Sequence, residues 1–251
     1  MVIFETVRKV NIHISVINTY MKLNTNPTSK QLSEIKSWLV EEKKNFNEGF
    51  YCNWNIIEKS FNENKLLVLE FDKKIVGFIT WTNHERKYVD IDIMEINRSF
   101  RKRGFGRILY KKTEEFFAEH NYIAIKLFCA PENSESFWKK MELIKFPYRG
   151  YSESELIYYK PLINTKELSV NKFLANKIEL WDIEPYEIKE QEPKWTWEIY
   201  NNNYPILQPC NPNWNLRLTK NGQIMKEDKI KYFDSEKEIE FGPFLYLTLT
   251  E

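Results

Sequence analysis

The stretch from 88 to 143 constrains the fold most, because it sets an apolar strand, a glycine-containing turn and an amphipathic helix in direct succession. Tyr88–Ile96 alternates apolar and polar residues as a strand does, and 107–120 has helical spacing. The first N–H groups of a helix have no partner inside it, and the helix dipole adds partial positive charge there. Gly104 and Gly106 would let the backbone approach an anion closely. This order of elements predicts a phosphate-binding turn.

Full positive charges surround the same turn, on Arg101, Lys102, Arg103 and Arg107. Two common phosphate motifs do not fit. A Walker loop would end in Gly-Lys-Ser/Thr, whereas this turn continues as Gly104-Phe105-Gly106-Arg107. The dinucleotide fingerprint needs a third glycine where Leu109 stands. The remaining pattern is R-x-x-G-x-G, directly after a strand.

That pattern resembles the acetyl-CoA loop of the GNAT acetyltransferase superfamily. The flanks agree with it: Ile96-Asn97-Arg98-Ser99-Phe100-Arg101 resembles the Val-x-Pro-x-Tyr/Phe-Arg that often precedes the loop. Downstream, 137–143 (Phe-Trp-Lys-Lys-Met-Glu-Leu) resembles the family's Phe-Tyr-x-Lys-x-Gly-Phe helix end. The resemblance is strongest over 88–143 and extends from about 66 to 160. The simpler alternative is a helix N-terminus with a solvated basic face.

The resemblance implies an α/β fold with a central mixed, partly splayed sheet and helices on both faces. The strand 88–96 and its parallel neighbour at 122–129 would part, and the gap would hold the pantetheine arm of acetyl-CoA, the expected cosubstrate. No metal is expected. The implied cofactor-binding residues are Ile96, Arg101, Lys102, Arg103, Gly104, Phe105, Gly106, Arg107, Asn133 and Trp138.

For catalysis, the resemblance implies a backbone N–H near 95–97 that polarises the thioester and a carboxylate base on the same strand. Asp92 is the first candidate for the base and Asp90 the second, although either could be a solvated sheet residue. Trp138 stands where the family commonly has a tyrosine that protonates the leaving thiolate, and an indole cannot do so. Glu142 also replaces the usual glycine.

The proton donor therefore stays open, with Tyr148, Tyr151, Cys129 and water as candidates. Asn133 or Ser134 is expected to cap the helix that runs to Lys140.

Charge and cysteine content narrow the class of protein. The chain has 37 basic and 36 acidic residues, which argues against general attraction to nucleic acid or membranes. The three cysteines are far apart and have no metal-ligand spacing, so we expect reduced thiols in the cytoplasm. No signal peptide or apolar run of membrane-spanning length is expected.

Periodicity predicts the remaining elements of the first part of the chain. We expect strands over 11–18, 66–71, 75–81, 145–148 and 154–159, and helices from Thr28 or Ser29 to about Lys44, over 54–61 and over 104–120. The unit from 88 to 129 should form a right-handed parallel crossover.

The pattern changes after about Leu162. We therefore predict a GNAT-like acetyl-CoA-binding domain over 1–162 and a smaller, mostly β module of unknown role over 163–251. This module should hold strands over 178–183, 195–200 and 241–250, with helical spacing only near 167–175. Asn221-Gly222 predicts a type I′ hairpin turn.

Two functions fit these features. The first is an N-acetyltransferase that moves an acetyl group from acetyl-CoA to an amine of a small molecule or protein. The alternative is a non-catalytic acyl-CoA-binding or interaction protein with a degenerate active site, whose β module carries partner specificity. Homodimerisation through the closing strands or the C-terminal module is a further expectation.

Overall fold

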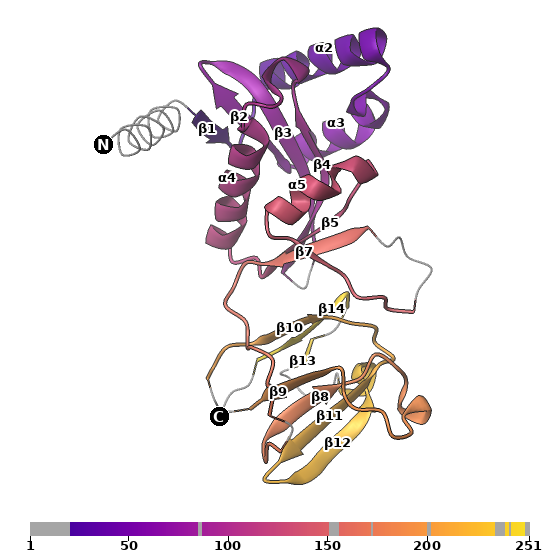
Figure 1. The fold of residues 1–251 in the computed structure, drawn as a ribbon. Coiled ribbons are helices and arrows are strands. Elements are labelled where there is room, and N and C mark those ends of the chain that lie inside the picture. Colours follow the sequence, from indigo (N-terminus) through magenta and orange to yellow (C-terminus); the bar gives the residue numbers. More distant parts are fainter. Residues whose placement is uncertain are drawn as a thin grey trace, which may run out of the picture. The chain divides into compact units, whose positions relative to one another are not determined.

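The computed structural model describes residues 21–84, 87–150, 156–171, 173–199, 202–233, 239–240 and 242–248. The chain divides into two compact units, Met1–Phe128 and Cys129–Glu251. Figure 1 labels helices and strands of both units. The strand expected over 11–18 lies outside the described residues.

The first unit is built on a sheet with the strand order β1-β2-β3-β4-β5. Its strands are β1 (Met21–Asn24), β2 (Leu66–Phe71), β3 (Lys74–Asn83), β4 (Tyr88–Ile96) and β5 (Ala124–Phe128). Neighbouring strands are antiparallel except for β4 and β5, which are parallel. The predicted strands over 66–96 and the parallel crossover are confirmed, because long apolar runs separated by short turns leave few other ways to bury their side chains.

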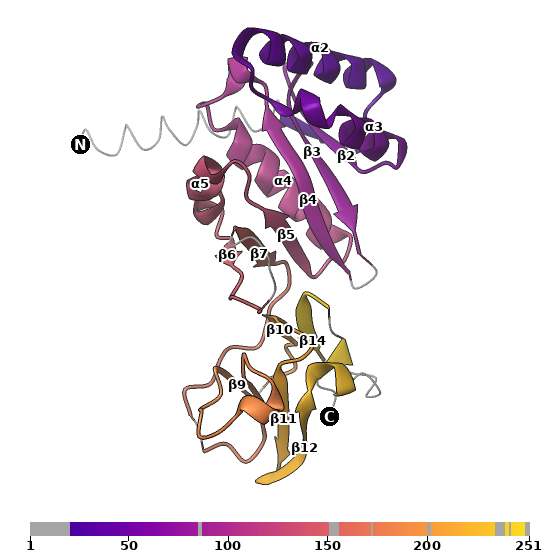
Figure 2. The same ribbon diagram turned by 90° about the vertical axis from the view of Figure 1, so that its right-hand side faces the viewer.

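Helices cover both faces of this sheet, as expected (Figure 2). On one face, α2 (Ser29–Phe46) and α3 (Trp54–Asn62) follow one another through a short 3₁₀ turn, η1 (Phe50–Asn53), and bury Ile35 and Ile57 against Phe78. Thr28 and Gln31 form a capping box that fixes the start of α2. On the other face, Phe117 of α4 (Phe105–Glu119) packs edge-on against Trp81, with ring centroids 5.2 Å apart.

The sheet splays where the resemblance implies. Pairing of β4 with β5 ends at Ile91 and Leu127, but β4 continues to Ile96, which pairs with Gly77 of β3. Within the described residues of the first unit, the last residues of β4 therefore bond to a neighbouring strand on one side only. This leaves a strand edge that directly precedes the glycine turn.

Gly77 allows β3 to approach the end of β4. A Cβ atom there would lie 2.4 Å from Ile96 Cδ1 and 2.7 Å from the Glu95 carbonyl oxygen. We expect Gly77→Ala to lower the free energy of unfolding by about 1–3 kcal/mol, as overpacking does. Urea unfolding measures this change. Ile96→Val removes the clashing methyl but not the carbonyl clash, so the double variant should recover only part of the loss. Full stability of Gly77→Ala alone would contradict this packing.

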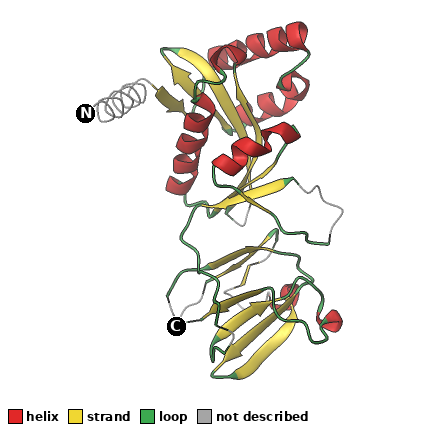
Figure 3. Cartoon of the chain, in the orientation of Figure 1, coloured by secondary structure: helices red, strands yellow, loops and turns green. Residues whose placement is uncertain are grey.

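The second unit begins with a short 3₁₀ turn, η3 (Glu132–Ser134), α5 (Glu135–Lys140) and the antiparallel pair β6 (Ile144–Lys145) and β7 (Ile157–Pro161). Two further sheets have the orders β12-β11-β8-β9 and β10-β14-β13 (Figure 3). Their strands are β8 (Lys177–Leu180), β9 (Trp195–Glu198), β10 (Ile206–Pro209), β11 (Asn215–Lys220), β12 (Gln223–Lys229), β13 (Ile239–Glu240) and β14 (Phe244–Leu247), with 3₁₀ turns η4 (Pro185–Glu187) and η5 (Ile230–Phe233). The β-rich C-terminal region is confirmed.

In the second unit, the hairpin turn at 221–222 agrees with its prediction, whereas the segment 167–175 does not. Asn221 and Gly222 have φ of 52° and 75°, which confirms the predicted hairpin turn between β11 and β12. The helical spacing near 167–175 does not correspond to a helix in the described residues. The described residues there are irregular, and the Ser169 N–H bonds to the Thr196 carbonyl of β9 instead of a helical partner. Helical spacing over so few residues does not outweigh a backbone partner offered by a neighbouring strand.

The predicted domain boundary at 162 stays a prediction. Phe244 packs against Phe146 and Tyr159 at 5.4 and 5.6 Å between ring centroids. We expect a fragment over 1–162 to fold and to bind CoA, but with a lower free energy of unfolding because these contacts are lost. Circular dichroism and calorimetry on the fragment test this. An unfolded fragment would contradict the boundary.

Candidate functional site

The glycine turn has a backbone conformation that favours glycine. After β4 the chain makes a short 3₁₀ turn, η2 (Arg98–Phe100), and then places Gly104 at φ 85° as the N-cap of α4. Lys102 is also left-handed, at φ 60°. A Cβ on Gly104 would meet nothing within 4 Å. Glycine is therefore favoured by backbone conformation and not by crowding from the described residues, and the turn is open to close approach of a ligand.

The N-terminus of α4 has no side-chain cap. Its first turn holds no acidic residue, and the Ile108 N–H makes the first helical bond, 3.2 Å to the Gly104 oxygen. The N–H groups of 105–107 thus precede the hydrogen-bonded helix. Such a helix end offers backbone donors and partial positive charge to an anion.

The predicted cofactor-binding residues of the turn differ in exposure. Lys102, Arg103, Gly104 and Arg107 are exposed, and Gly106 is half-buried. In the described part of the chain, no ion pair involves Lys102 or Arg107. The Phe105 side chain is buried, with Phe71 and Phe100 ring centroids at 5.3 and 5.7 Å, so Phe105 can offer a ligand only its backbone. The turn thus brings together three exposed cations and uncapped N–H groups.

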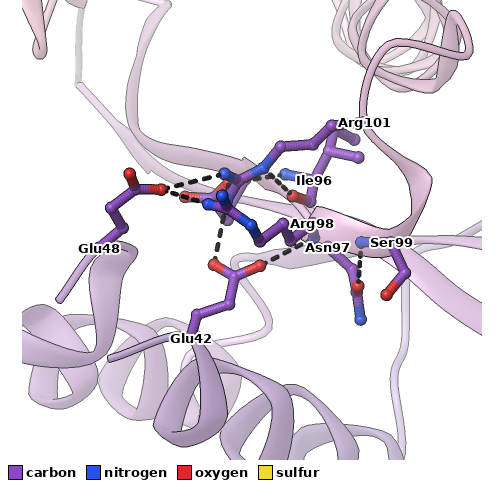
Figure 4. Close-up of polar contacts among 8 residues, drawn as sticks. Glu42, Glu48, Ile96, Asn97, Arg98, Ser99 and Arg101 are labelled. Atoms are coloured by element: carbon purple, nitrogen blue, oxygen red, sulfur yellow. Dashed lines mark hydrogen bonds and ion pairs between the residues drawn. The ribbon is translucent and has the colours of Figure 1, made fainter. Parts of the chain in front are cut away.

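Arg101 lies differently, since its guanidinium is already surrounded by acceptors (Figure 4). Its Nη2 donates to Glu42 Oε2 and to Glu95 Oε1, both at 2.9 Å. Its Nε donates to the Ile96 carbonyl oxygen at 2.9 Å. Arg98 pairs with Glu48, Nη1 to Oε2, at 2.6 Å. Arg98 and Arg101 are the two arginines of the turn nearest to β4. Both therefore bond to groups of the protein itself.

Glu95 is the most strongly perturbed carboxyl of this cluster. Burial raises its pKa, the Arg101 charge opposes the rise, and the Glu42 charge adds to it, which gives a pKa of about 7. Its Oε1 accepts the Ile96 N–H at 3.1 Å. Both backbone polar groups of Ile96 are thus engaged within the protein.

This pKa predicts how stability changes with pH. The folded state holds a proton on Glu95 between pH 4.5, its ordinary pKa, and about pH 7. The stability contributed by this proton is greatest below pH 4.5 and is lost as pH rises towards 7. We expect Glu95→Gln to remove a pH-dependent component on the order of 2 kcal/mol. Urea unfolding from pH 4.5 to 8 measures it, with the exposed Glu48→Gln as control. Parallel pH curves for wild type and Glu95→Gln would contradict the assignment.

The two candidate bases have different surroundings. Asp90 is paired with Lys126 of β5, Nζ to Oδ1 at 2.8 Å, and with His84, Nε2 to Oδ2 at 2.8 Å. Asp92 is the extra residue of a β-bulge, because Thr80 pairs with Ile93 and Trp81 pairs with Ile91. Asp90 is therefore held by an ion pair with Lys126 and a contact with His84, whereas Asp92 is skipped in the pairing of β4 with β3.

Asp92 is exposed and its Oδ2 accepts one hydrogen bond, from Thr82 Oγ1 at 2.9 Å. Loss of solvent around the carboxyl raises its pKa, the Thr82 bond opposes the rise, and the nearby Asp90 charge adds to it. A carboxylate with a raised pKa is a better proton acceptor than an ordinary aspartate.

The remaining predicted residues, Asn133, Ser134 and Trp138, belong to the second unit. Trp138 is buried and Asn133 is exposed. Ser134 is the N-cap of α5, but its side chain does not cap the helix. It lies in right-handed helical backbone and its Oγ lies 3.2 Å from Cys129 Sγ. The predicted side-chain cap is therefore wrong.

Among the alternative proton donors, Tyr148 is exposed, Cys129 is buried, and Tyr151 lies outside the described residues. Tyr158 was not predicted. It is buried and donates a short hydrogen bond to Glu135 Oε1. Burial and the Glu135 carboxylate raise its pKa to about 12. Such a phenol stays protonated at neutral pH.

Glu42 is a further residue of the site that was not predicted. It lies on α2 at helical spacing from Ile35, Trp38 and Leu39, all of which are buried. A carboxylate on the apolar face of a helix requires a buried partner, so its position carried a usable signal.

The described residues hold neither a candidate metal site nor a helix able to span a membrane. They contain no group of three or more His, Cys, Asp or Glu that could hold a metal ion. No helix among them has the length and apolar character needed to cross a membrane.

The splayed sheet with a glycine turn at the start of α4 defines a GNAT-like α/β domain. Residues 31–142 match the model of the acetyltransferase (GNAT) family. The predicted resemblance is therefore confirmed for this segment, which matches a GNAT acetyltransferase domain. No curated protein matches the chain.

Solved structures with a similar fold are GNAT proteins. An acetyltransferase of Staphylococcus aureus Mu50 has 15% identity over 57% of this chain and 99% of its own, with a TM-score of 0.45. PaiA N-acetyltransferase of Thermoplasma acidophilum, solved in complex with coenzyme A, has 17% identity over 56% of this chain and 98% of its own, with a TM-score of 0.44.

Proposed function

We propose that the protein is an N-acetyltransferase that binds acetyl-CoA at the Gly104 turn and transfers the acetyl group to an amine. The observation that carries this proposal is the uncapped N-terminus of α4, which directly follows the one-sided end of β4. The turn would hold the pyrophosphate through the N–H groups of 105–107, and Lys102, Arg103 and Arg107 would add charge. The free edge of β4 would pair with the pantetheine amides.

Asp92 would take the proton from the acceptor amine. It is exposed, its pKa is raised, and it lies on the strand that leads to the turn. Asp90 would serve mainly to hold β4 against β5 through Lys126. In apo enzymes catalytic hydrogen bonds are often incomplete, so Asp92 needs no further partner before the acceptor binds.

The thioester would be polarised by a backbone N–H near the end of β4. The Ile96 N–H already donates to Glu95 Oε1. This group would therefore have to exchange the Glu95 carboxylate for the thioester oxygen when acetyl-CoA binds. Since Glu95 has a pKa of about 7, it can become neutral and release the N–H at little cost near neutral pH.

A non-catalytic acyl-CoA-binding protein is the second candidate, favoured by Trp138. Its indole stands where the family commonly has a tyrosine, and an indole cannot protonate a thiolate. In this case the turn would still bind CoA.

Calorimetry with CoA, followed by acetyl-CoA consumption assays with a panel of amines and peptides, tests both candidates. Turnover above the rate in buffer with at least one amine supports the acetyltransferase. Tight CoA binding without turnover on any amine would favour the binding protein. No CoA binding would overturn both.

A further inference from the structure

We propose that Glu42 of α2 is a positioning residue for the phosphate-binding turn, acting through the Arg98 backbone and the Arg101 side chain. This inference rests on the proposed function and adds a residue that positions the proposed CoA-binding turn. Glu42 lies 56 residues before the turn in sequence, and both of its carboxylate oxygens are used by the turn.

The contacts of Glu42 join backbone and side chain of the same segment. Its Oε1 accepts the Arg98 N–H at 2.8 Å, and its Oε2 accepts Arg101 Nη2 at 2.9 Å (Figure 4). The side chain is 6% exposed. A carboxylate this buried costs free energy unless it is paired and hydrogen-bonded, so its contacts with the turn stabilise one geometry strongly.

Arg101 extends this support to the end of β4. The guanidinium that Glu42 holds also donates to the Ile96 carbonyl and to Glu95 Oε1. Arg101 therefore links α2, the last residue of β4 and the start of the turn. With these acceptors already in place, we assign Arg101 to supporting the turn and leave the phosphates to Lys102, Arg103 and Arg107.

The chain around Glu42 leaves room for this carboxylate. Gly49 has φ of 80°, and a Cβ atom there would lie 2.9 Å from Glu42 Oε2. Gly49→Ala therefore crowds the carboxylate without changing any charge.

Glu42→Gln separates positioning from simple electrostatics by the sign of its effect. It removes a negative charge close to an anion site, which by itself would tighten CoA binding. A positioning role predicts weaker binding, because the pair with Arg101 is lost. We expect Glu42→Gln to lower CoA affinity about threefold to tenfold and Glu42→Ala, which also loses the Arg98 N–H bond, about tenfold or more.

The matched control is Glu48→Gln. Glu48 is exposed and pairs with Arg98 Nη1 and Arg101 Nη1 at 2.6 and 3.7 Å, and both of these contacts are to side chains of the turn. This variant removes the same charge from the same cluster, and we expect its CoA affinity to be equal to or higher than that of wild type.

Calorimetry with CoA on the full chain measures these affinities, and amide hydrogen exchange reports the turn directly. The Arg98 N–H should exchange faster in Glu42→Ala than in Glu48→Gln. If Glu42→Ala does not fold, Glu42→Gln and Gly49→Ala carry the test, and both should weaken binding. Equal or tighter CoA binding by folded Glu42→Gln would overturn the inference while leaving the proposed function intact. A wild-type chain that binds no CoA would overturn both.

Discussion

Replacing Asp92 with asparagine is expected to lower turnover about a hundredfold or more, the range typical of a lost general base. Asparagine keeps the shape of the side chain and can still accept the Thr82 hydrogen bond, but it cannot take a proton from an amine. In wild type the turnover should rise with one ionisation above the ordinary pKa of aspartate, because the Asp92 pKa is raised. That ionisation should disappear in the variant.

Asp90→Asn is the matched control on the same strand. Its carboxylate is held by Lys126 and His84, so its loss should weaken the contact between β4 and β5 more than the chemistry. Acetyl-CoA consumption over a range of pH, with unfolding free energies for both variants, distinguishes these effects. A hundredfold loss of turnover in Asp90→Asn with near-normal turnover in Asp92→Asn would contradict these roles. Asp90 would then be the base and Asp92 would not.

Replacing Gly104 with valine is expected to lower CoA affinity tenfold or more. The left-handed backbone at φ 85° costs a residue with a Cβ about 1–2 kcal/mol, and more for a β-branched side chain. The new side chain would also point into space that the proposed site leaves to the phosphates, since no other described residue beyond the chain neighbours lies within 4 Å of a Cβ there. Both effects act on the same turn, so the loss of affinity should exceed the loss of stability.

Gly222→Val provides the control for backbone strain. Gly222 has φ of 75°, and a Cβ there also meets nothing within 4 Å, but it belongs to the hairpin between β11 and β12. We expect both variants to lose stability by similar amounts, while only Gly104→Val loses CoA affinity. Calorimetry that gives Gly104→Val the affinity of wild type would contradict a phosphate site at this turn.

The sequence by itself determined several local elements of both units, although it did not predict β1. β2, β4 and α4 have long, regular apolar patterns, and Thr28 with Gln31 marks the start of α2 by a capping box. The turn at Asn221-Gly222 is set by residues that tolerate positive φ. These features depend on neighbours within a few positions, so sequence patterns suffice. The helical spacing at 167–175 did not produce a helix, because the Ser169 N–H bonds to the Thr196 carbonyl of β9.

Only the tertiary structure decided which charges of the turn are paired within the protein. In sequence, Arg98, Arg101, Lys102, Arg103 and Arg107 look alike. Folding brings α2 and the segment after it beside the turn, and Glu42 and Glu48 then engage Arg98 and Arg101. Likewise, Asp90 and Asp92 differ because the parallel strand β5 places Lys126 beside Asp90, while the bulge sets Asp92 apart. Ion pairing and burial depend on residues distant in sequence, which a local pattern does not encode.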